Sequence, residues 1–352
     1  MTNAATSTGG LRREHGLTGF GESMLCLSLS PDQRCTVFGV GAEANLVSYA
    51  ALVGVRARWV SRLGKDQAGD IIEAELVARG VDVVATRDAS HQTALCIKDS
   101  RDGVVRMRYY RSDSAATVFD GVESLAIDNT AWLHLTGIDL ALSEQTRAAT
   151  IALARAAVQV GTRVSFDVNY RPALWTSPEE CWNACQEIFP LADLIFIGDD
   201  EAEILLPDVP RAKARQSMLR GPGQILIYKR GSLGAEFVTD RESGFVPALD
   251  VPALDVPVIE ATGAGDALAA GVVVGLLRDQ SIEQSLVLGV KFAATAIQTH
   301  RDVSSASELR AHADVHDLLG WSAAVCQNDQ ARFSPAKAGA SIERRPGVGK
   351  QA

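Results

Sequence analysis

The amino-acid sequence predicts an α/β fold in which helices cover a mostly parallel β-sheet. Short apolar runs alternate with amphipathic segments of helical periodicity, which is the pattern of repeated strand–helix–strand units. The chain has 352 residues, of which 47% are hydrophobic, so it can bury the core of one large domain or two modest ones.

The strands and helices can be assigned in order along the chain. The first strand is predicted at Gly21–Leu29, followed by a helix at Glu43–Val53 and a strand at Arg58–Ser61. A helix over Asp66–Arg79 ends at Gly80, because glycine readily adopts the left-handed conformation that closes a helix. The remaining predicted strands are Ala131–Leu135, Val164–Val168, Leu194–Ile197 and Ile225–Lys229, and the remaining predicted helices include Glu144–Val160, Pro178–Ile188 and Ala267–Leu277.

Two stretches interrupt this pattern and predict a small β lid outside the main sheet. Thr93–Lys98 and Val104–Arg111 alternate apolar and polar residues, as the two strands of a hairpin do. We therefore expect a lid built from about residues 30–40 and 90–115. Because such a sheet has exposed edges, we also predict a homodimer or higher homo-oligomer that pairs through the lid.

The two ends of the chain lack the apolar periodicity of its centre. We expect residues 1–16 and 327–352 to be disordered tails flanking one domain at 17–326. The first 16 residues contain no apolar core of a signal peptide, and the longest apolar stretch, Ala267–Leu277, is too short to span a bilayer. These features predict a cytoplasmic protein with no membrane partner.

The charge balance narrows the class of partner further. The chain carries 34 basic and 43 acidic side chains, a formal net charge of −9 at pH 7. An acidic surface disfavours nucleic acid as a partner, because phosphate backbones are bound through clustered basic residues. A small anionic substrate remains possible, since its site needs only local positive charge.

The most informative motif is the run from Ala261 to Asp266, Ala-Thr-Gly-Ala-Gly-Asp, which leads into the last predicted helix. Glycines at a helix start leave backbone N–H groups free to bind an anion, and the helix dipole adds positive charge there. A carboxylate such as Asp266 would repel a phosphate bound at this turn. Its presence is explained if it accepts a proton from a hydroxyl that attacks the phosphate. Alone, the string fits a simple helix cap equally well; the chain contains neither a Walker loop nor a G-x-G-x-x-G run.

This motif resembles the D-T-x-G-A-G-D signature of the ribokinase-like (PfkB) carbohydrate kinases, and the similarity extends over roughly Gly21–Asp302. The resemblance implies a three-layer sandwich with a β lid, and ATP as the phosphoryl donor. It implies that Asp266 is the catalytic base and that Gly263, Ala264 and Gly265 form the anion hole. Thr262, Gly263 and Gly265 would also contact the nucleotide.

Three internal segments resemble those of 2-keto-3-deoxygluconate kinases within that family. They are Gly41–Asn45 (G-A-E-A-N), Tyr109–Arg111 (Y-Y-R) and Asp167–Arg171 (D-V-N-Y-R). The implied function is ATP-dependent phosphorylation of 2-keto-3-deoxygluconate at its terminal hydroxyl, giving the 6-phosphate and ADP. The substrate contacts implied by the resemblance are Gly41, Asn45, Tyr109, Arg111, Asn169, Arg171 and Asp302.

The chemistry of the two arginines agrees with a sugar-acid substrate. A guanidinium matches a carboxylate through two parallel hydrogen bonds, so Arg111 and Arg171 are candidates to bind the acid end of the substrate. A surface salt bridge is the alternative for each. Tyr109 and Tyr110 should point to opposite faces of their strand, and the resemblance favours Tyr109 as the one that faces the sugar.

The resemblance places the nucleotide near Lys229 and Gly231, at the end of a predicted strand. It also implies that Glu201 helps to hold Mg²⁺ with the phosphates, since hard cations prefer oxygen ligands. The alternative for Glu201 is an exposed carboxylate at a helix start.

The chain departs from the family pattern at Val40, Cys96, Gly198 and Glu260. These departures keep two other functions open: another PfkB-type sugar or sugar-acid kinase, such as a fructokinase or a ribokinase-like enzyme, and a non-catalytic sugar-binding protein.

Overall fold

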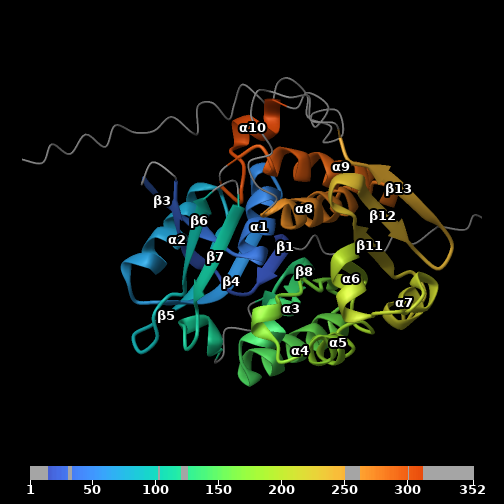
Figure 1. Ribbon diagram of the computed structural model, residues 1–352, viewed down its shortest axis with the longest axis horizontal. Coiled ribbons are helices and arrows are strands. Elements are labelled where there is room, and N and C mark those ends of the chain that lie inside the picture. Colours follow the sequence, from blue (N-terminus) through green and yellow to red (C-terminus); the bar gives the residue numbers. More distant parts are fainter. Residues whose placement is uncertain are drawn as a thin grey trace, which may run out of the picture.

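The computed structural model describes residues 15–30, 34–101, 104–119, 126–249, 262–299 and 301–311. A nine-stranded sheet in the order β13-β12-β11-β10-β9-β8-β1-β4-β5 forms the centre of the molecule (Figure 1). All neighbours are parallel except β11–β12 and β12–β13. The strands are β1 (His15–Phe20), β4 (Ala57–Gly64), β5 (Asp82–Asp88), β8 (Thr130–Thr136), β9 (Arg163–Asp167), β10 (Leu194–Gly198), β11 (Ile225–Lys229), β12 (Gly234–Val238) and β13 (Ser243–Pro247).

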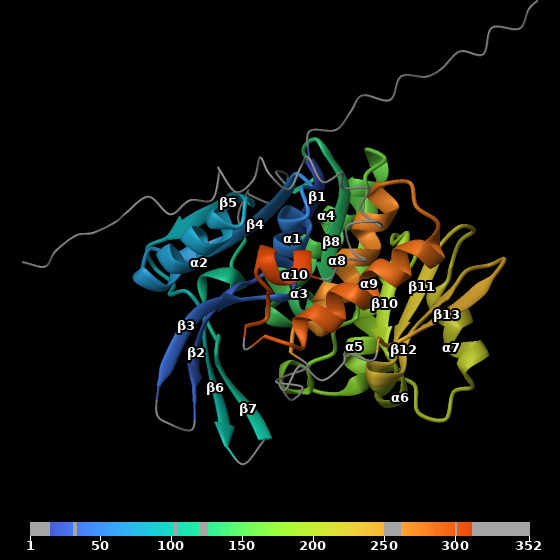
Figure 2. The ribbon, with the colours of Figure 1, turned by 90° about the horizontal axis from the view of Figure 1, so that it is seen from above.

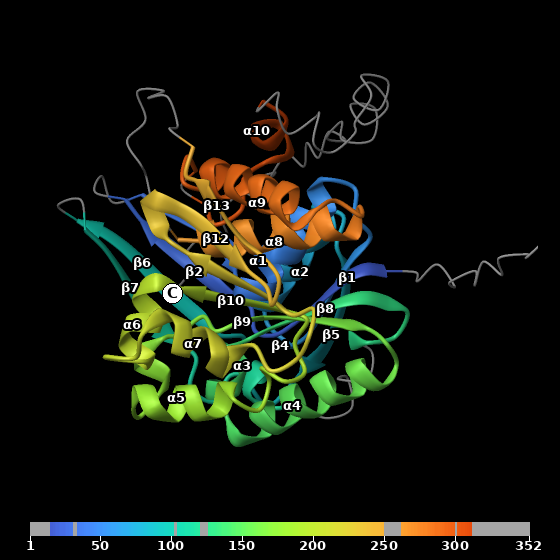
Figure 3. The same ribbon diagram turned by 90° about the vertical axis from the view of Figure 1, so that its right-hand side faces the viewer.

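Helices cover both faces of this sheet, so the expected three-layer α/β sandwich is confirmed (Figures 1 and 3). One layer contains α1 (Ala42–Leu52), α2 (Gln67–Ala78), α8 (Ala264–Leu277) and α9 (Ile282–Ala296), with the short α10 (Ala306–Ala311) beyond α9. The other contains α3 (Gly137–Leu142), α4 (Glu144–Gln159), α5 (Pro178–Cys185), α6 (Asp199–Leu205) and α7 (Arg211–Met218). The short 3₁₀ turns are η1 (Ala115–Thr117), η3 (Pro172–Leu174) and η4 (Gly231–Leu233). A separate apolar cluster fills the space between the sheet and each layer.

The second sheet has four strands and projects from the body on one side (Figure 2). Its order is β3-β2-β6-β7, with β2 (Met24–Leu29), β3 (Cys35–Val40), β6 (Leu95–Arg101) and β7 (Val104–Tyr110). We call this four-stranded sheet the lid. Val40 and Cys96, two of the departures from the family pattern, are buried in a small apolar cluster within it.

The start of the chain differs from the sequence-based expectation. Gly21–Leu29 is not one strand of the main sheet, because β1 ends at Phe20 and the following β2 belongs to the lid. The first strand of the main sheet begins at His15, inside the segment expected to be a tail. Gly16 and Gly19 interrupt the apolar pattern of β1, so the pattern did not predict this strand. Gly19 is required because a Cβ at this position would lie 2.9 Å from Val47 Cγ1 and 3.1 Å from the Glu43 carbonyl oxygen on α1.

Helices α8 and α9 are packed backbone against backbone. A Cβ on Gly271 would lie 2.5 Å from Gly289 Cα, so only glycine permits this approach. The residues from Ala267 to Gly275 are all buried. The first turn of α8 is therefore attached to a rigid element of the core. No helix in the described ranges has the length and hydropathy to cross a membrane.

Candidate active site

The candidate site lies where the carboxyl ends of the parallel strands meet the first turn of α8. Gly263 is the N-cap of α8 and has φ 81°, in the left-handed region that favours glycine. A Cβ on Gly263 would lie 2.6 Å from the Asp302 carbonyl oxygen, which excludes any larger residue. The structure thus brings the predicted Asp302 against the predicted anion-binding turn, in which Ala264 and Gly265 are the first residues of α8.

Asp266 lies in that first turn and is partly exposed. Asn45 on α1 donates a hydrogen bond from Nδ2 to Asp266 Oδ2 at 2.8 Å. Desolvation raises the pKa of Asp266 to about 7, and the Asp167 carboxylate adds to this rise, whereas the Asn45 hydrogen bond, Arg171 and Lys229 oppose it. A carboxylate with a pKa near neutrality suits a general base, because it is substantially ionised at physiological pH and still accepts a proton readily.

Lys229 supplies positive charge beneath the glycine turn. Its Nζ lies 2.7 and 2.8 Å from the two carboxylate oxygens of Asp167, at the ends of β11 and β9. A Cβ on Gly265 would lie 3.5 Å from Lys229 Nζ. Burial opposes the charge on Lys229, but Asp167, Glu201 and Asp266 together raise its pKa, so it stays an ammonium ion. Lys229 therefore lies beside the turn whose N–H groups are predicted to bind an anion.

The loop after β9 carries two further predicted residues. Asn169 has φ 42° and is 3% exposed, and its backbone N–H donates to Asp167 Oδ1 at 3.2 Å. Its side-chain Oδ1 is buried and has no hydrogen-bond donor within the described ranges. Arg171 is exposed, and no carboxylate in the described part of the chain pairs with it. Its charge lowers the pKa of both Asp266 and Tyr109, so it faces the same space as both.

Arg111 has a different environment from Arg171. It is buried, 8% exposed, and its Nη2 pairs with the Glu22 carboxylate at the end of the β1–β2 turn. Ser114 Oγ also donates to Glu22, at 3.2 Å. Burial raises the pKa of Glu22 although Arg111 lowers it. The two arginines that the sequence grouped together therefore have different partners and different exposure.

Tyr109 and Tyr110 follow the expected alternation along β7. Burial raises the pKa of Tyr109, with Arg171, Cys96, Arg111 and Asp302 among the groups that act on it. Its ring centroid lies 5.5 Å from the guanidinium carbon of Arg111, and 41% of the residue remains exposed. Tyr110 is 56% exposed. Tyr109 thus lies on the lid face that looks toward the arginines.

Glu201 and Gly41 have clear local roles. Glu201 Oε1 accepts the backbone N–H of Tyr170 at 2.9 Å and Oε2 accepts that of Gly198 at 2.6 Å, so this carboxylate closes the start of α6 and fixes the loop after β9. Gly41 is the N-cap of α1, and a Cβ there would lie 2.4 Å from the Glu22 carbonyl oxygen.

Sequence reasoning missed three charged residues at this site: Glu22, Asp167 and Lys98. Lys98 Nζ lies 3.9 Å from Asp302 Oδ1, and both side chains are buried. Asp167 had a detectable signal, because a carboxylate at the carboxyl end of a buried parallel strand reaches the edge where ligands bind. Glu260 lies outside the described residues.

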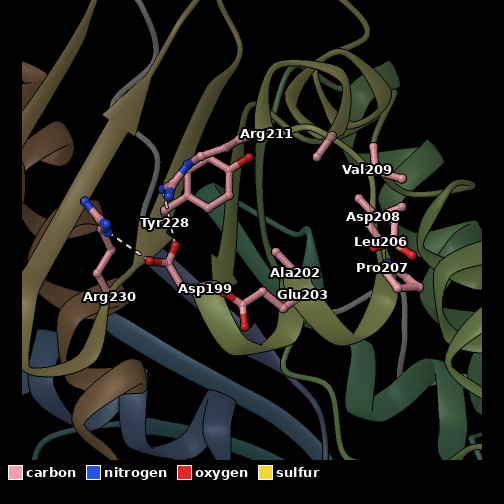
Figure 4. A pocket seen from close by; sticks show the side chains of 11 residues that line it. Asp199, Ala202, Glu203, Leu206, Pro207, Asp208, Val209, Arg211, Tyr228 and Arg230 are labelled. Carbon is pink, nitrogen blue, oxygen red and sulfur yellow. Dashed lines mark hydrogen bonds and ion pairs between the residues drawn. The ribbon is translucent and has the colours of Figure 1, made fainter.

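A cavity of about 480 Å³ adjoins the nucleotide motifs without containing the base (Figure 4). It lies between α6, α7 and the end of β11. Arg230 Nε donates to Asp199 Oδ2 at 2.8 Å, and Arg211 pairs with Asp199 at 3.2 Å. Asp199 follows Gly198, and Arg230 lies between Lys229 and Gly231, so the cavity is next to the predicted nucleotide residues in the chain.

Comparison with known proteins shows which family has this sequence and fold. The family model of the pfkB family carbohydrate kinases matches residues 28–309. The chain is 32% identical over 293 residues to a 2-dehydro-3-deoxygluconokinase of Bacillus subtilis, covering 80% of this chain and 89% of that protein. It is 30% identical over 301 residues to a 2-dehydro-3-deoxygalactonokinase of Haloferax volcanii, covering 82% and 92%.

A solved structure of a fructokinase with bound ATP from Xylella fastidiosa shares the fold. The TM-score is 0.74 at 22% sequence identity, and the match covers 86% of this chain and 98% of that chain. The three-layer sandwich, Asp266 in its glycine turn and these matches agree. The chain belongs to the pfkB family of carbohydrate kinases.

Proposed function

We propose that this kinase phosphorylates 2-keto-3-deoxygluconate (2-dehydro-3-deoxygluconate) at its terminal hydroxyl, with MgATP as donor, and releases the 6-phosphate and ADP. The observation that carries the substrate assignment is Arg171, an exposed guanidinium without a carboxylate partner in the described residues, whose charge reaches Asp266. A sugar acid with a carboxylate at one end and a primary hydroxyl at the other spans these two groups.

Asp266 and the helix start supply the chemistry of transfer. Asp266 accepts the proton of the attacking hydroxyl, while Gly263, Ala264 and Gly265 direct backbone N–H groups at the transferred phosphoryl group. Lys229 adds a fixed positive charge under the same turn. Asp167 holds this ammonium in place, so its carboxylate acts on the phosphate through Lys229.

The sugar is held by groups from the loop after β9 and from the lid. Asn169 offers a buried Oδ1 that no donor among the described residues reaches, and a substrate hydroxyl would donate a hydrogen bond to it. Tyr109 offers a phenol from β7. Arg111, already paired with Glu22, would orient Tyr109 and the lid rather than bind the carboxylate, which leaves Arg171 as the anchor.

The described residues contain no group of three His, Cys, Asp or Glu side chains that would hold a metal ion. This fits Mg²⁺ that enters with the nucleotide, because that ion usually keeps several waters and takes its remaining ligands from phosphates. Both oxygens of Glu201 already accept backbone N–H groups. We propose that Glu201 contacts the waters of the ion through its remaining lone pairs. The bound ion would neutralise charge on the phosphates.

A second candidate is phosphorylation of a neutral ketose, since a fructokinase shares the fold. A neutral sugar gives Arg171 no carboxylate to bind. The two candidates therefore predict different effects of removing that guanidinium.

A coupled assay of ADP release tests the proposal with 2-keto-3-deoxygluconate, its galacto epimer, gluconate, fructose and ribose. We expect selectivity for the keto-deoxy acids. Turnover of fructose or ribose in preference to them would refute the substrate and keep the kinase.

The variant Arg171→Ala isolates the carboxylate anchor. We expect KM for the keto-deoxy acid to rise about 10- to 100-fold, the equivalent of one charge-assisted pair. The assay is run at pH 8.5, because removal of Arg171 also raises the pKa of Asp266. Arg108→Ala, which changes an exposed arginine on β7, is the matched control. Equal KM values in the two variants would contradict the anchor.

A further inference from the structure

Two buried carboxyl groups lie beside the active site and take no part in the chemistry described above. Glu43 is in the first turn of α1, Asp139 is in the first turn of α3, and both are 0% exposed. The position that a Cβ on Gly21 would occupy lies 2.5 Å from Glu43 Oε2 and 2.8 Å from Asp139 Oδ2. The two carboxyl groups therefore face each other across Gly21, where β1 ends.

Neither group has the partners that a buried carboxylate requires. Within the described ranges, none of the four oxygens of Glu43 and Asp139 receives a well-formed hydrogen bond. The Thr136 hydroxyl and the backbone N–H of Glu43 lie close enough only to lower the pKa of Glu43 somewhat. Two adjacent carboxylates without donors are strongly unfavourable in a site shielded from water, whereas one proton between them gives each a partner.

We propose that Glu43 and Asp139 share one proton as a hydrogen-bonded carboxyl–carboxylate pair, and that this pair positions Asn45 and, through Asn45, the catalytic base Asp266. The pair joins the start of α1 to the start of α3. Asn45 is two residues after Glu43 in the first turns of α1, and its side chain donates to Asp266.

The charges around the pair favour retention of the proton. Burial raises the pKa of Glu43 to about 7, and burial together with Glu43 and Glu22 raises that of Asp139 well above its ordinary value. Asp266 acts in the same direction from α8. Arg111 is the opposing cation, and it is already paired with Glu22.

The other helices packed on α3 carry one more pair of charged residues close to Asp139 in the fold. Arg147 on α4 donates to the Leu140 carbonyl oxygen at 2.7 Å and pairs with Glu180 on α5 at 3.1 Å. Its guanidinium also lies 5.4 Å from the Trp175 ring centroid, so these contacts are all with groups other than Glu43 and Asp139. The shared proton is therefore what neutralises the charge of one of the two carboxyl groups.

Loss of the shared proton would leave two like charges facing each other across Gly21. Their repulsion would separate the first turn of α1 from α3 and weaken the Asn45–Asp266 hydrogen bond. The kcat of the kinase should then fall at alkaline pH, because the shared proton is lost. The fall of kcat at acid pH has a different cause, the protonation of Asp266. The kinetic arm of the test rests on the proposed substrate, whereas the spectroscopic and unfolding arms do not.

The kinetic test compares the wild type with Asp139→Asn, Asp139→Ala and Glu43→Gln between pH 6 and pH 10. The amides in Asp139→Asn and Glu43→Gln donate to the remaining carboxylate at every pH, so we expect the alkaline decline of kcat to disappear in both. Asp139→Ala leaves Glu43 without a partner, so we expect kcat to fall about 10-fold or more, with the KM for ATP within about 2-fold of wild type. Ser48→Ala, one turn further along α1, is the control that keeps the wild-type profile. An alkaline limb that persists in Asp139→Asn and Glu43→Gln would overturn the positioning role.

Two measurements test the shared proton without relying on turnover. Infrared difference spectroscopy should detect the C=O stretch of a protonated carboxyl group at pH 8 in the wild type and not in Asp139→Asn. Because the folded-state pKa values are raised, the folded protein binds more protons than the unfolded chain above about pH 4.5, and its stability falls as the pH rises through 7.

We expect the midpoint of thermal unfolding of the wild type to drop, between pH 5 and pH 8, by roughly 3–6 °C more than that of Asp139→Asn. If the wild type shows no protonated carboxyl at pH 8, the shared proton is refuted, whichever sugar the enzyme uses.

Discussion

Removing the hydrogen bond from Asn45 to Asp266 should shift the pH dependence of catalysis in a defined direction. The Asn45 amide donates to the ionised form of Asp266 at 2.8 Å and so lowers the pKa of this carboxyl, which lies at about 7. A hydrogen bond to a charged group contributes about 1.5–3 kcal/mol, which corresponds to roughly 1–2 pKa units. Because Asp266 is partly exposed, we take the lower end of this range.

The variant Asn45→Ala should therefore move the acid limb of kcat upward by about 1 pH unit. At pH 7 the ionised fraction of Asp266 should fall from about one half to about one tenth, and turnover should fall with it and recover toward pH 9. Steady-state ADP release between pH 5.5 and pH 9.5, with saturating substrates, measures the shift. Ser48→Ala on the same helix is the control. An acid limb that stays in place in Asn45→Ala would refute either the hydrogen bond or the assignment of the limb to Asp266.

Three further substitutions test separate parts of the structure. Asp266→Asn should lower kcat about 10²- to 10⁴-fold while the unfolding midpoint does not fall, since a partly desolvated charge is removed. Near-normal turnover would exclude Asp266 as the base. Arg111→Met should destabilise the fold by about 3–5 kcal/mol in denaturant titration, because Glu22 is left buried without its cation, and a change below 1 kcal/mol would contradict that. Gly271→Ala should lower the free energy of unfolding by about 1–3 kcal/mol and lower kcat, because the added methyl would lie 2.5 Å from Gly289 Cα and displace α8. Wild-type stability and wild-type kcat in this variant would show that the two helices can move apart without cost.

The sequence predicted those elements whose apolar residues are continuous or clearly periodic. The core strands β8 to β11 and the helices α1, α2, α4 and α8 match the predicted segments to within a few residues. It failed where glycine replaced the apolar signal. Gly16 and Gly19 interrupt the apolar residues of β1, so this strand was not predicted and its first two residues were assigned to the tail. Gly19 is required there because α1 approaches it closely. Without that strand, Gly21–Leu29 was assigned to the wrong sheet.

The candidate site could be predicted in part, since motifs identify residue types but not their partners. The run around Asp266 predicted a glycine turn at the start of a helix, and the structure contains that turn, because it depends on local backbone geometry. The roles of Asp266 as base and of the turn as anion site stay predictions. The two arginines looked alike in sequence, and only the fold shows that Arg111 meets Glu22, 89 residues away, whereas Arg171 stays exposed. The Glu43–Asp139 pair also depends on tertiary contact, so local spacing gives no signal for it.

The attachment of α8 to α9 through facing glycines separates two tasks of the enzyme. The proposed base and the glycine turn are carried by a helix packed into the core, while Tyr109 lies on β7 of the sheet that projects from the body and Arg111 directly follows that strand. In the proposed site, substitutions in that projecting sheet change the sugar contacts without displacing the first turn of α8. A scaffold divided in this way can diverge toward new substrates while its phosphorylation chemistry is inherited unchanged.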